Sequence, residues 1–66
     1  MNIQYNGKIL ELSEGLSVEQ FIRQKGLHPE TVIVEYNFQL VTREAWTSIV
    51  LKENDSLEIL RFVGGG

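Results

Sequence analysis

The feature that most constrains this chain is an Asn-Gly pair close to its start, set between short apolar segments. Asn6-Gly7 readily adopts the positive φ angles of a type I′ turn, which joins two antiparallel strands. Apolar residues flank the pair on both sides: Ile3, Tyr5, Ile9, Leu10 and Leu12. The pattern predicts a β-hairpin at the beginning of the chain.

A short helix is predicted after the hairpin. Ser17, followed three residues later by Gln20, fits a capping box at a helix start. One helical face collects the apolar side chains of the segment: Val18, Phe21 and Ile22. Gly26 suits a left-handed C-terminal cap, and Pro29 prevents the helix from continuing.

The remaining chain alternates between extended segments and turns. Extended segments are predicted at residues 31–36, 39–41, 48–51 and 57–63. Asn37-Phe38 is the predicted turn between the first two, and Thr42 is the predicted cap of a helical turn that ends at Trp46. The last strand would lie parallel to the first in a mixed sheet. This order predicts an α+β domain of the β-grasp type, with four to five strands packed on one helix.

Composition narrows the class of protein. The 66 residues allow one domain, and 42% hydrophobic with 23% charged residues argues against disorder. The absence of cysteine excludes disulfides and thiolate chemistry. A net charge of -3 without a basic patch argues against nucleic acid as a partner. No apolar run approaches the roughly 20 residues that cross a membrane, and nothing resembles a signal peptide, so we expect a cytoplasmic protein.

The chain given ends in three glycines, which have no side chains to pack and lose the most backbone freedom on ordering. We therefore divide the chain into a β-grasp domain at residues 1–63 and a flexible tail at residues 64–66. Three extended residues reach on the order of 10 Å. The tail predicts that the α-carboxylate of Gly66 is the functional group. Gly64 and Gly65 are predicted to thread into the active site of a partner enzyme and so deliver that carboxylate.

The last strand predicts a docking surface beside the tail. Side chains alternate along a strand, so Leu57 and Ile59 are assigned to the core. Glu58, Leu60 and Phe62 then fall on the opposite face, where two large apolar residues are unusual. They are candidates for contact with a partner protein. The alternative is that a loop covers Leu60 and Phe62 in a small satellite core.

Catalytic and metal-binding patterns find no support in the sequence. The nine acidic residues are scattered, without a spacing that demands two carboxylates in one pocket. His28 is the only histidine and has no cysteine or second histidine as a fellow ligand, so no metal site is expected. Trp46 is expected to pack in the core. The sequence therefore predicts that the chain is not an enzyme.

Over its whole length the chain resembles the ThiS family, ubiquitin-like β-grasp proteins that carry sulfur in thiamin biosynthesis. The resemblance is carried by Asn6-Gly7-Lys8, Asn37, Val41-Thr42-Arg43-Glu44, Trp46 and the segment from Asp55 to Gly66. The chain departs from the family pattern at Thr42, where proline is common, and at Gly64, which precedes the usual terminal Gly-Gly pair.

The resemblance implies a chemistry for Gly66. A ThiF-like adenylyltransferase would adenylate its carboxylate with ATP, a sulfur-donating enzyme would supply sulfur, and the resulting thiocarboxylate would serve a ThiG-like thiazole synthase. The chain itself would bind no cofactor. Three alternatives stay open: a molybdopterin-synthase-type sulfur carrier, a ubiquitin-like covalent modifier joined to lysine, and a binding module whose tail is inert.

Overall fold

The structure is a computed structural model, and it describes residues 1–13 and 15–62. Predictions that fall on Glu14 or on residues 63–66, the glycine tail included, lie outside the described residues. The elements in chain order are β1 (Asn2–Tyr5), β2 (Lys8–Glu11), α1 (Val18–Gln24), the 3-10 helix η1 (Pro29–Thr31), β3 (Val32–Tyr36), β4 (Gln39–Val41), the 3-10 helix η2 (Arg43–Ser48) and β5 (Ser56–Arg61). None of the described helices is long and apolar enough to cross a membrane.

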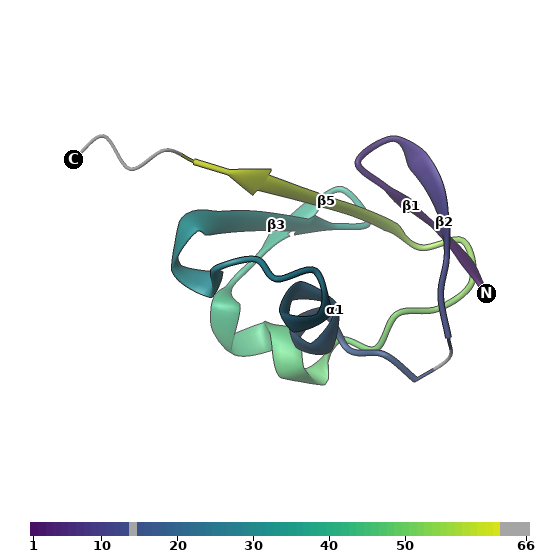
Figure 1. Cartoon of the computed structure of the whole chain (residues 1–66), viewed down its shortest axis with the longest axis horizontal. Helices are drawn as coiled ribbons and strands as arrows, with labels where there is room; N and C mark the ends of the chain where they lie inside the picture. Colours follow the sequence, from purple (N-terminus) through teal and green to yellow (C-terminus); the bar gives the residue numbers. More distant parts are fainter. Residues whose placement is uncertain (14, 63–66) are drawn as a thin grey trace.

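The five strands form one mixed sheet in the order β2-β1-β5-β3-β4, with β5 parallel to β1 and antiparallel to β3. The predicted parallel placement of the last strand beside the first is therefore confirmed. Figure 1 shows α1 and η2 on one side of the sheet, with β5 running across the molecule from the β1–β2 end to the opposite end. The buried core lies between these layers: Ile3, Val18, Phe21, Ile22, Val32, Val34, Trp46, Leu51, Leu57 and Ile59.

The first hairpin turns as the Asn-Gly pair predicts. Tyr5 pairs with Lys8, which leaves a two-residue loop, and the φ angles are 51° at Asn6 and 84° at Gly7. Positive φ at both central positions defines the type I′ turn. A hairpin closed this tightly fixes the register of β1 against β2.

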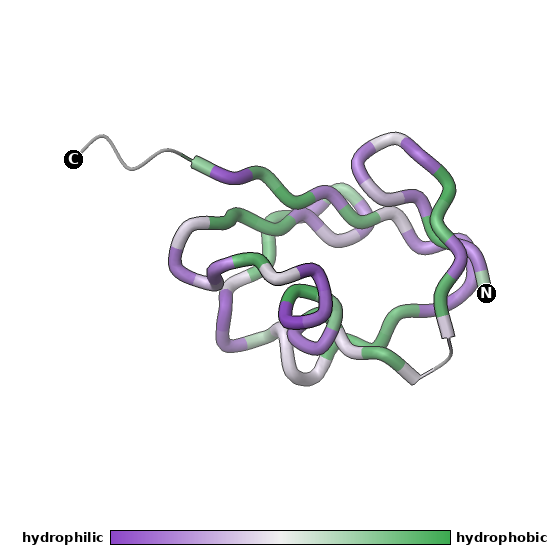
Figure 2. The backbone as a smooth tube through the Cα atoms, in the orientation of Figure 1, coloured by the Kyte–Doolittle hydropathy of each residue, from purple (hydrophilic) through white to green (hydrophobic). Residues whose placement is uncertain are grey.

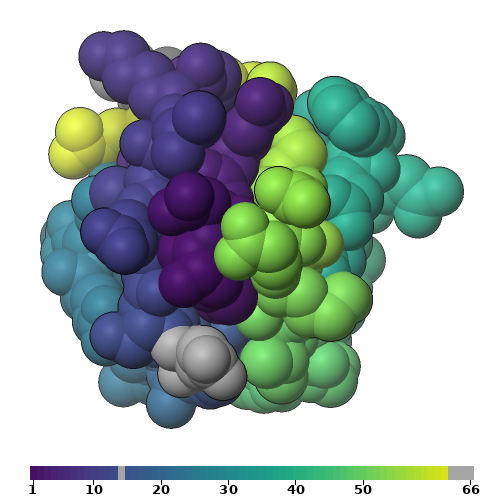
Figure 3. All heavy atoms as spheres, turned by 90° about the vertical axis from the view of Figure 1, so that its right-hand side faces the viewer, coloured from purple at the N-terminus to yellow at the C-terminus, as the bar shows by residue number. Residues whose placement is uncertain are grey.

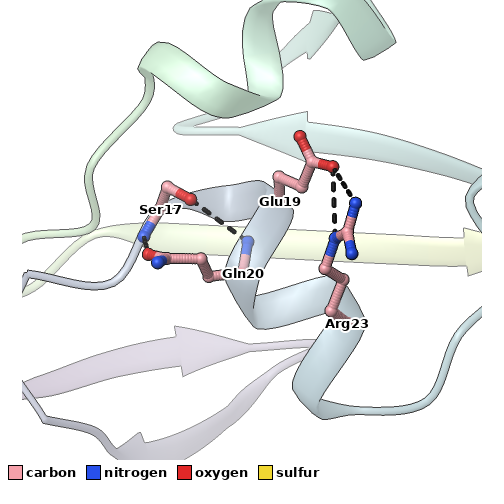
Figure 4. Close-up of polar contacts among 4 residues, drawn as sticks. All are labelled: Ser17, Glu19, Gln20 and Arg23. Carbon is pink, nitrogen blue, oxygen red and sulfur yellow. Dashed lines mark hydrogen bonds and ion pairs between the residues drawn. The ribbon is translucent and has the colours of Figure 1, made fainter.

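Helix α1 is bounded by the predicted capping residues, and Figure 4 draws the capping box at its N-terminal end. The Ser17 hydroxyl accepts a hydrogen bond from the Gln20 N–H at 3.1 Å, and the Gln20 side chain accepts one from the Ser17 N–H at 2.9 Å. At the other end Gly26 has a φ of 72°, and its N–H donates to the Arg23 carbonyl at 3.0 Å. Both ends satisfy backbone groups that a seven-residue helix would otherwise leave unpaired.

Two local predictions for the second half of the chain are confirmed in part. Thr42 holds the N-cap position of the predicted helical turn, η2, but this turn continues to Ser48 and the Thr42 side chain makes no capping hydrogen bond. The predicted extended segment at residues 48–51 is extended at Ile49 but lies outside the five-stranded sheet, and Val50 pairs there in a single bridge to Ser17. Its neighbours Ile49 and Leu51 bond through their backbones to the residues that enter α1, at 2.9 and 2.8 Å. The segment is thus used to fasten α1 to the rest of the domain.

Candidate functional site

The candidate site is the end of β5, which leads the chain toward the glycine residues. Pairing with β3 continues to Arg61, opposite Val32, and the Phe62 N–H still donates to the Thr31 carbonyl at 3.0 Å. On the other side, pairing with β1 ends at Leu57. The end of β5 is therefore hydrogen-bonded on one side alone, to β3 up to Arg61 and to the last residue of η1 at Phe62.

Side chains alternate along β5 as the sequence predicts. Leu57 and Ile59 are buried in the core, whereas Glu58, Leu60 and Phe62 are exposed. Leu60 is 60% exposed and Phe62 46%, so the alternative of a satellite core under a loop is wrong. In Figure 2 hydrophobic and hydrophilic colours alternate along β5, and the tube is hydrophobic again at its described end.

The exposed apolar surface is larger than the sequence suggested. Ile33, 43% exposed, lies directly opposite Leu60, and Leu40 on β4 is 69% exposed. Because residues paired across neighbouring strands share a face, these side chains belong to the uncovered side of the sheet. We call this set the open-face patch: Ile33, Leu40, Leu60 and Phe62. The sequence missed Ile33 because β3 is almost continuously apolar and does not reveal its two faces.

Acidic side chains border the open-face patch. Glu58 on β5 lies opposite Glu35 on β3, and the register places both on the same side of the sheet as Leu60. Two neighbouring carboxylates give this border a negative potential. A partner with an apolar centre and a basic margin would therefore complement the surface.

The beginning of β5 is fixed by a buried carboxylate. Asp55 is 6% exposed and accepts three hydrogen bonds: from the Tyr36 hydroxyl at 2.7 Å, the Lys52 N–H at 2.8 Å and the Asn37 amide at 3.2 Å. Burial alone would raise the pKa of Asp55, but these donors outweigh it and hold the pKa below its usual range. Burial and the bond to Asp55 in turn raise the pKa of Tyr36. The sequence contained Asp55 only as part of a polar turn.

Two turn asparagines also hold β5 in place. Asn6 accepts a hydrogen bond from the Ile59 N–H at 2.8 Å and donates one to the Ile59 carbonyl at 3.2 Å. Asn37 accepts one from the Ser56 N–H at 2.8 Å. Each asparagine is the first of the two central residues of a tight turn, with φ of 51° at Asn6 and 50° at Asn37. Two residues that look like simple turn formers thus fix the strand that carries the candidate site.

Other candidate residues stand apart from this site. Trp46 is 3% exposed and packs in the core, which confirms its predicted role. His28 is exposed before η1. Among residues 1–13 and 15–62, no three potential metal-ligating side chains come together.

Comparison with known proteins decides the family. Residues 3–66 match the ThiS family. The chain belongs to that family. A crystal structure of the thiamine biosynthesis protein ThiS from Geobacter metallireducens matches with a TM-score of 0.86 and 35% identity over all of both chains. This match confirms the ubiquitin-like β-grasp architecture.

Relatives of this ThiS-family chain occur both as separate proteins and inside longer ones. The sulfur carrier protein ThiS of Bacillus subtilis is 31% identical over 97% of this chain and 98% of its own length. A thiazole synthase of Magnetococcus marinus is 36% identical over the whole chain, which spans only 20% of that synthase. The roles predicted for Glu58, Leu60, Phe62 and the glycine tail stay predictions.

Proposed function

We propose that this ThiS-family chain is a sulfur carrier of thiamin biosynthesis and that the α-carboxylate of Gly66 carries the sulfur. The observation that supports this most strongly is the match over almost all of both chains to a separate sulfur carrier protein ThiS. Membership of the family also supports a carrier protein that is a substrate of other enzymes, and not a catalyst.

The proposed chemistry turns an inert carboxylate into a sulfur donor in two steps. A carboxylate oxygen of Gly66 attacks the α-phosphorus of ATP, which releases pyrophosphate and leaves an acyl-adenylate. Hydrosulfide, HS⁻, supplied by a sulfur-donating enzyme then attacks the carbonyl carbon, AMP leaves, and the S–H proton is lost to solvent. The product is a thiocarboxylate at Gly66. The adenylating partner, and not this chain, would bind the ATP.

The residues before Gly66 suit insertion into a partner's active site. Gly64 and Gly65 have no Cβ atoms, so the walls of a narrow channel can approach their backbone closely. Alignment of the carboxylate with the phosphate would lower the entropic part of the barrier. We therefore propose that Gly64 and Gly65 serve to carry the Gly66 carboxylate through a channel too narrow for residues with side chains.

Two partners are proposed from different observations. Glu58, Leu60 and Phe62 would contact a ThiF-like adenylyltransferase, because they form an exposed apolar and acidic surface beside the tail. A ThiG-like thiazole synthase is supported by the synthases that contain a segment similar to this whole chain. Those names favour thiamin biosynthesis over the molybdopterin alternative. These reactions would take place in the cytoplasm, where we expect the chain.

The test is the intact mass of the chain after incubation with a ThiF-like adenylyltransferase, ATP and a sulfur source. We expect one oxygen to be replaced by sulfur, and we expect the enzyme to catalyse exchange between pyrophosphate and ATP when the chain is present. Deletion of Gly66 should abolish or badly impair both, because it shortens the reach of the carboxylate by one residue, and Gly65→Ala should do the same because its Cβ would clash with the walls of the channel. The intact mass also reports whether Gly66 is the last residue.

Two controls make this test specific. The variants should unfold at the same temperature as the wild-type chain, because the tail follows the last core residue of β5. Capping the Gly66 carboxylate as an amide should block exchange while preserving length. Undiminished exchange after deletion of Gly66 would contradict the proposal, and isopeptide conjugates on lysine would favour the covalent modifier.

A further inference from the structure

The two tight hairpins of this fold use the same turn with different residues. Asn6-Gly7 has φ angles of 51° and 84°, and Asn37-Phe38 has φ angles of 50° and 70°. The second position of a type I′ turn favours glycine, which Gly7 supplies in the first hairpin. The second hairpin places a phenylalanine where the first has the residue that the geometry prefers.

Phe38 gains no packing in return for this strain. A left-handed backbone is unfavourable for a residue with a Cβ. A buried aromatic side chain would offset that cost, but Phe38 is 78% exposed. Strain that the fold itself does not need is an argument for a role outside the fold.

Phe38 forms one wall of a groove at the beginning of β5. The groove has a volume of about 390 Å³, and the second wall, Ile9, is 73% exposed. Figure 3 shows this end of the molecule, where the teal β3–β4 turn stands out beside the green segment that leads into β5. Polar residues and one buried apolar residue complete the lining: Asn2, Ile3, Gln4, Asn37, Asn54 and Ser56. We call this site the hairpin groove.

We propose that the hairpin groove binds an uncharged, extended segment of the ThiF-like adenylyltransferase, the partner to which the open-face patch is assigned. An apolar side chain of that segment would sit between Phe38 and Ile9. The amide and hydroxyl groups of the lining would hydrogen-bond to its backbone. This inference rests on the proposed function, since it assigns a second contact to the same partner.

The chemistry of the groove selects a peptide. None of the described lining residues is charged, so a nucleotide, a phosphate or a metal ion would find no counter-charge. Small-molecule sites bury most of their ligand, about 70–90% of its surface. Walls as exposed as Phe38 and Ile9 do not enclose a free ligand. An open groove of this kind can instead receive a segment that projects from the surface of another protein.

One partner is large enough to cover both the groove and the open-face patch. Gln4 and Ser56 of the groove, and Leu60 of the patch, lie on the uncovered side of the sheet, as their pairing registers require. From Ser56 to Phe62 is roughly 20 Å at about 3.3 Å per residue. A standard interface covers about 800 Å² of each partner, a disc on the order of 30 Å across. The two contacts therefore fit within one interface.

The test compares Phe38→Asn and Ile9→Thr with the wild-type chain in binding to a ThiF-like adenylyltransferase and, separately, to a ThiG-like thiazole synthase. Asparagine tolerates positive φ, and threonine suits a strand, so both variants should fold. We expect the dissociation constant for the adenylyltransferase to rise about tenfold, as for a contact at an interface hot spot. A rise for the thiazole synthase alone would overturn the proposal. Val50→Ser, a 49% exposed residue bridged to Ser17 at the start of α1, should leave binding unchanged.

A second series separates this inference from the proposed function. Phe38→Asn is combined with deletion of Gly66, and the two effects on binding free energy should add if the groove and the tail contact the partner independently. If deletion of Gly66 weakens binding while Phe38→Asn and Ile9→Thr do not, the proposed function stands and the hairpin groove is overturned. If neither enzyme binds the wild-type chain, both are overturned. Unfolding in urea should show that Phe38→Asn is no less stable than the wild-type chain, so that weaker binding reflects a lost contact.

Discussion

At the scale of single residues, the start of β5 depends on one buried carboxylate. Asp55 joins the turn before β5 to Tyr36 on β3 and to Asn37 in the following turn. A buried carboxylate is tolerated only when hydrogen bonds replace its hydration, and here three donors do so. The position of β5, and with it the direction in which the chain approaches the tail, therefore rests partly on the charge of Asp55.

This network predicts a pH dependence of stability. Because the folded-state pKa of Asp55 is lowered, its contribution is present above the unfolded-state pKa of about 3.9 and is lost as pH falls through the folded-state pKa. In that interval the unfolded chain binds more protons, so the free energy of unfolding rises with pH. Asp55→Asn should lower the free energy of unfolding by roughly 1–3 kcal/mol at pH 7 and flatten its fall below about pH 4.

Urea denaturation at a series of pH values from neutral to acidic checks this prediction. The matched control is Glu44→Gln, a change at an exposed carboxylate on η2, which should leave the curve close to that of the wild-type chain. A curve for Asp55→Asn as steep in acid as the wild-type curve would show that other groups cause the acid sensitivity.

Single residues also mark where sequence reasoning fails. The alternation that exposes Leu60 and buries Ile59 follows from strand geometry and was predictable. The hydrogen bonds of Asp55 and the positive φ of Phe38 were not, because the first depend on segments distant in sequence and the second is a backbone angle that the residue type does not favour. The turn at Asn37 was predicted correctly, but the hydrogen bond that its side chain accepts from the Ser56 N–H was not.

At the scale of elements, α1 is short enough to depend on its ends. Seven residues form few internal hydrogen bonds, so the capping box supplies a large share of its local stability. Ser17→Ala removes the hydroxyl that accepts from the Gln20 N–H and should lower the free energy of unfolding by about 1 kcal/mol. Thermal and urea unfolding would measure the change.

The exposed ion pair on the same helix provides the comparison. Arg23 and Glu19 approach to 3.1 Å, but both side chains are solvent-accessible, so the pair should contribute less than about 0.5 kcal/mol. Arg23→Gln should therefore destabilise the chain less than Ser17→Ala. The reverse order would show that surface charge, and not capping, limits the helix.

Elements were predictable where local chemistry decides them. The Asn-Gly hairpin and the capped helix each contain their own start and stop signals. Residues 48–51 contain β-branched and apolar side chains that suit a strand, yet Ile49 and Leu51 bond to the segment that enters α1. Tertiary contacts decide whether this segment joins the sheet or bonds to the start of α1. The local sequence therefore does not reveal which of the two it does.

At the scale of the whole molecule, β5 belongs to two surfaces at once. One face of the strand completes the core against α1, and the other forms the open-face patch and the floor of the hairpin groove. A two-layer domain leaves one side of its sheet uncovered, and such a side is normally polar. The apolar side chains there are not required by the fold, which leaves them available for a partner.

Substitutions at two leucines of β5 should distinguish the residues that stabilise the fold from those that bind the partner. Leu57 is fully buried and Leu60 is 60% exposed. Leu57→Ala should lower the free energy of unfolding by roughly 2–5 kcal/mol, because it leaves a cavity in the core. Leu60→Ser should change it by less than about 0.5 kcal/mol.

For binding to the partner we expect the opposite order, with a larger effect from Leu60→Ser than from Leu57→Ala. In pyrophosphate exchange with a ThiF-like adenylyltransferase, Leu60→Ser should raise the KM for the chain about tenfold with little change in kcat, since docking contributes to binding and not to the chemical step. Leu57→Ala should leave the KM of the folded fraction near its wild-type value, because its side chain faces away from the partner. Equal KM values for the wild-type chain and Leu60→Ser would place the docking surface elsewhere on the domain. If Leu60→Ser instead lowered kcat with KM unchanged, the open-face patch would act on alignment of the tail after docking.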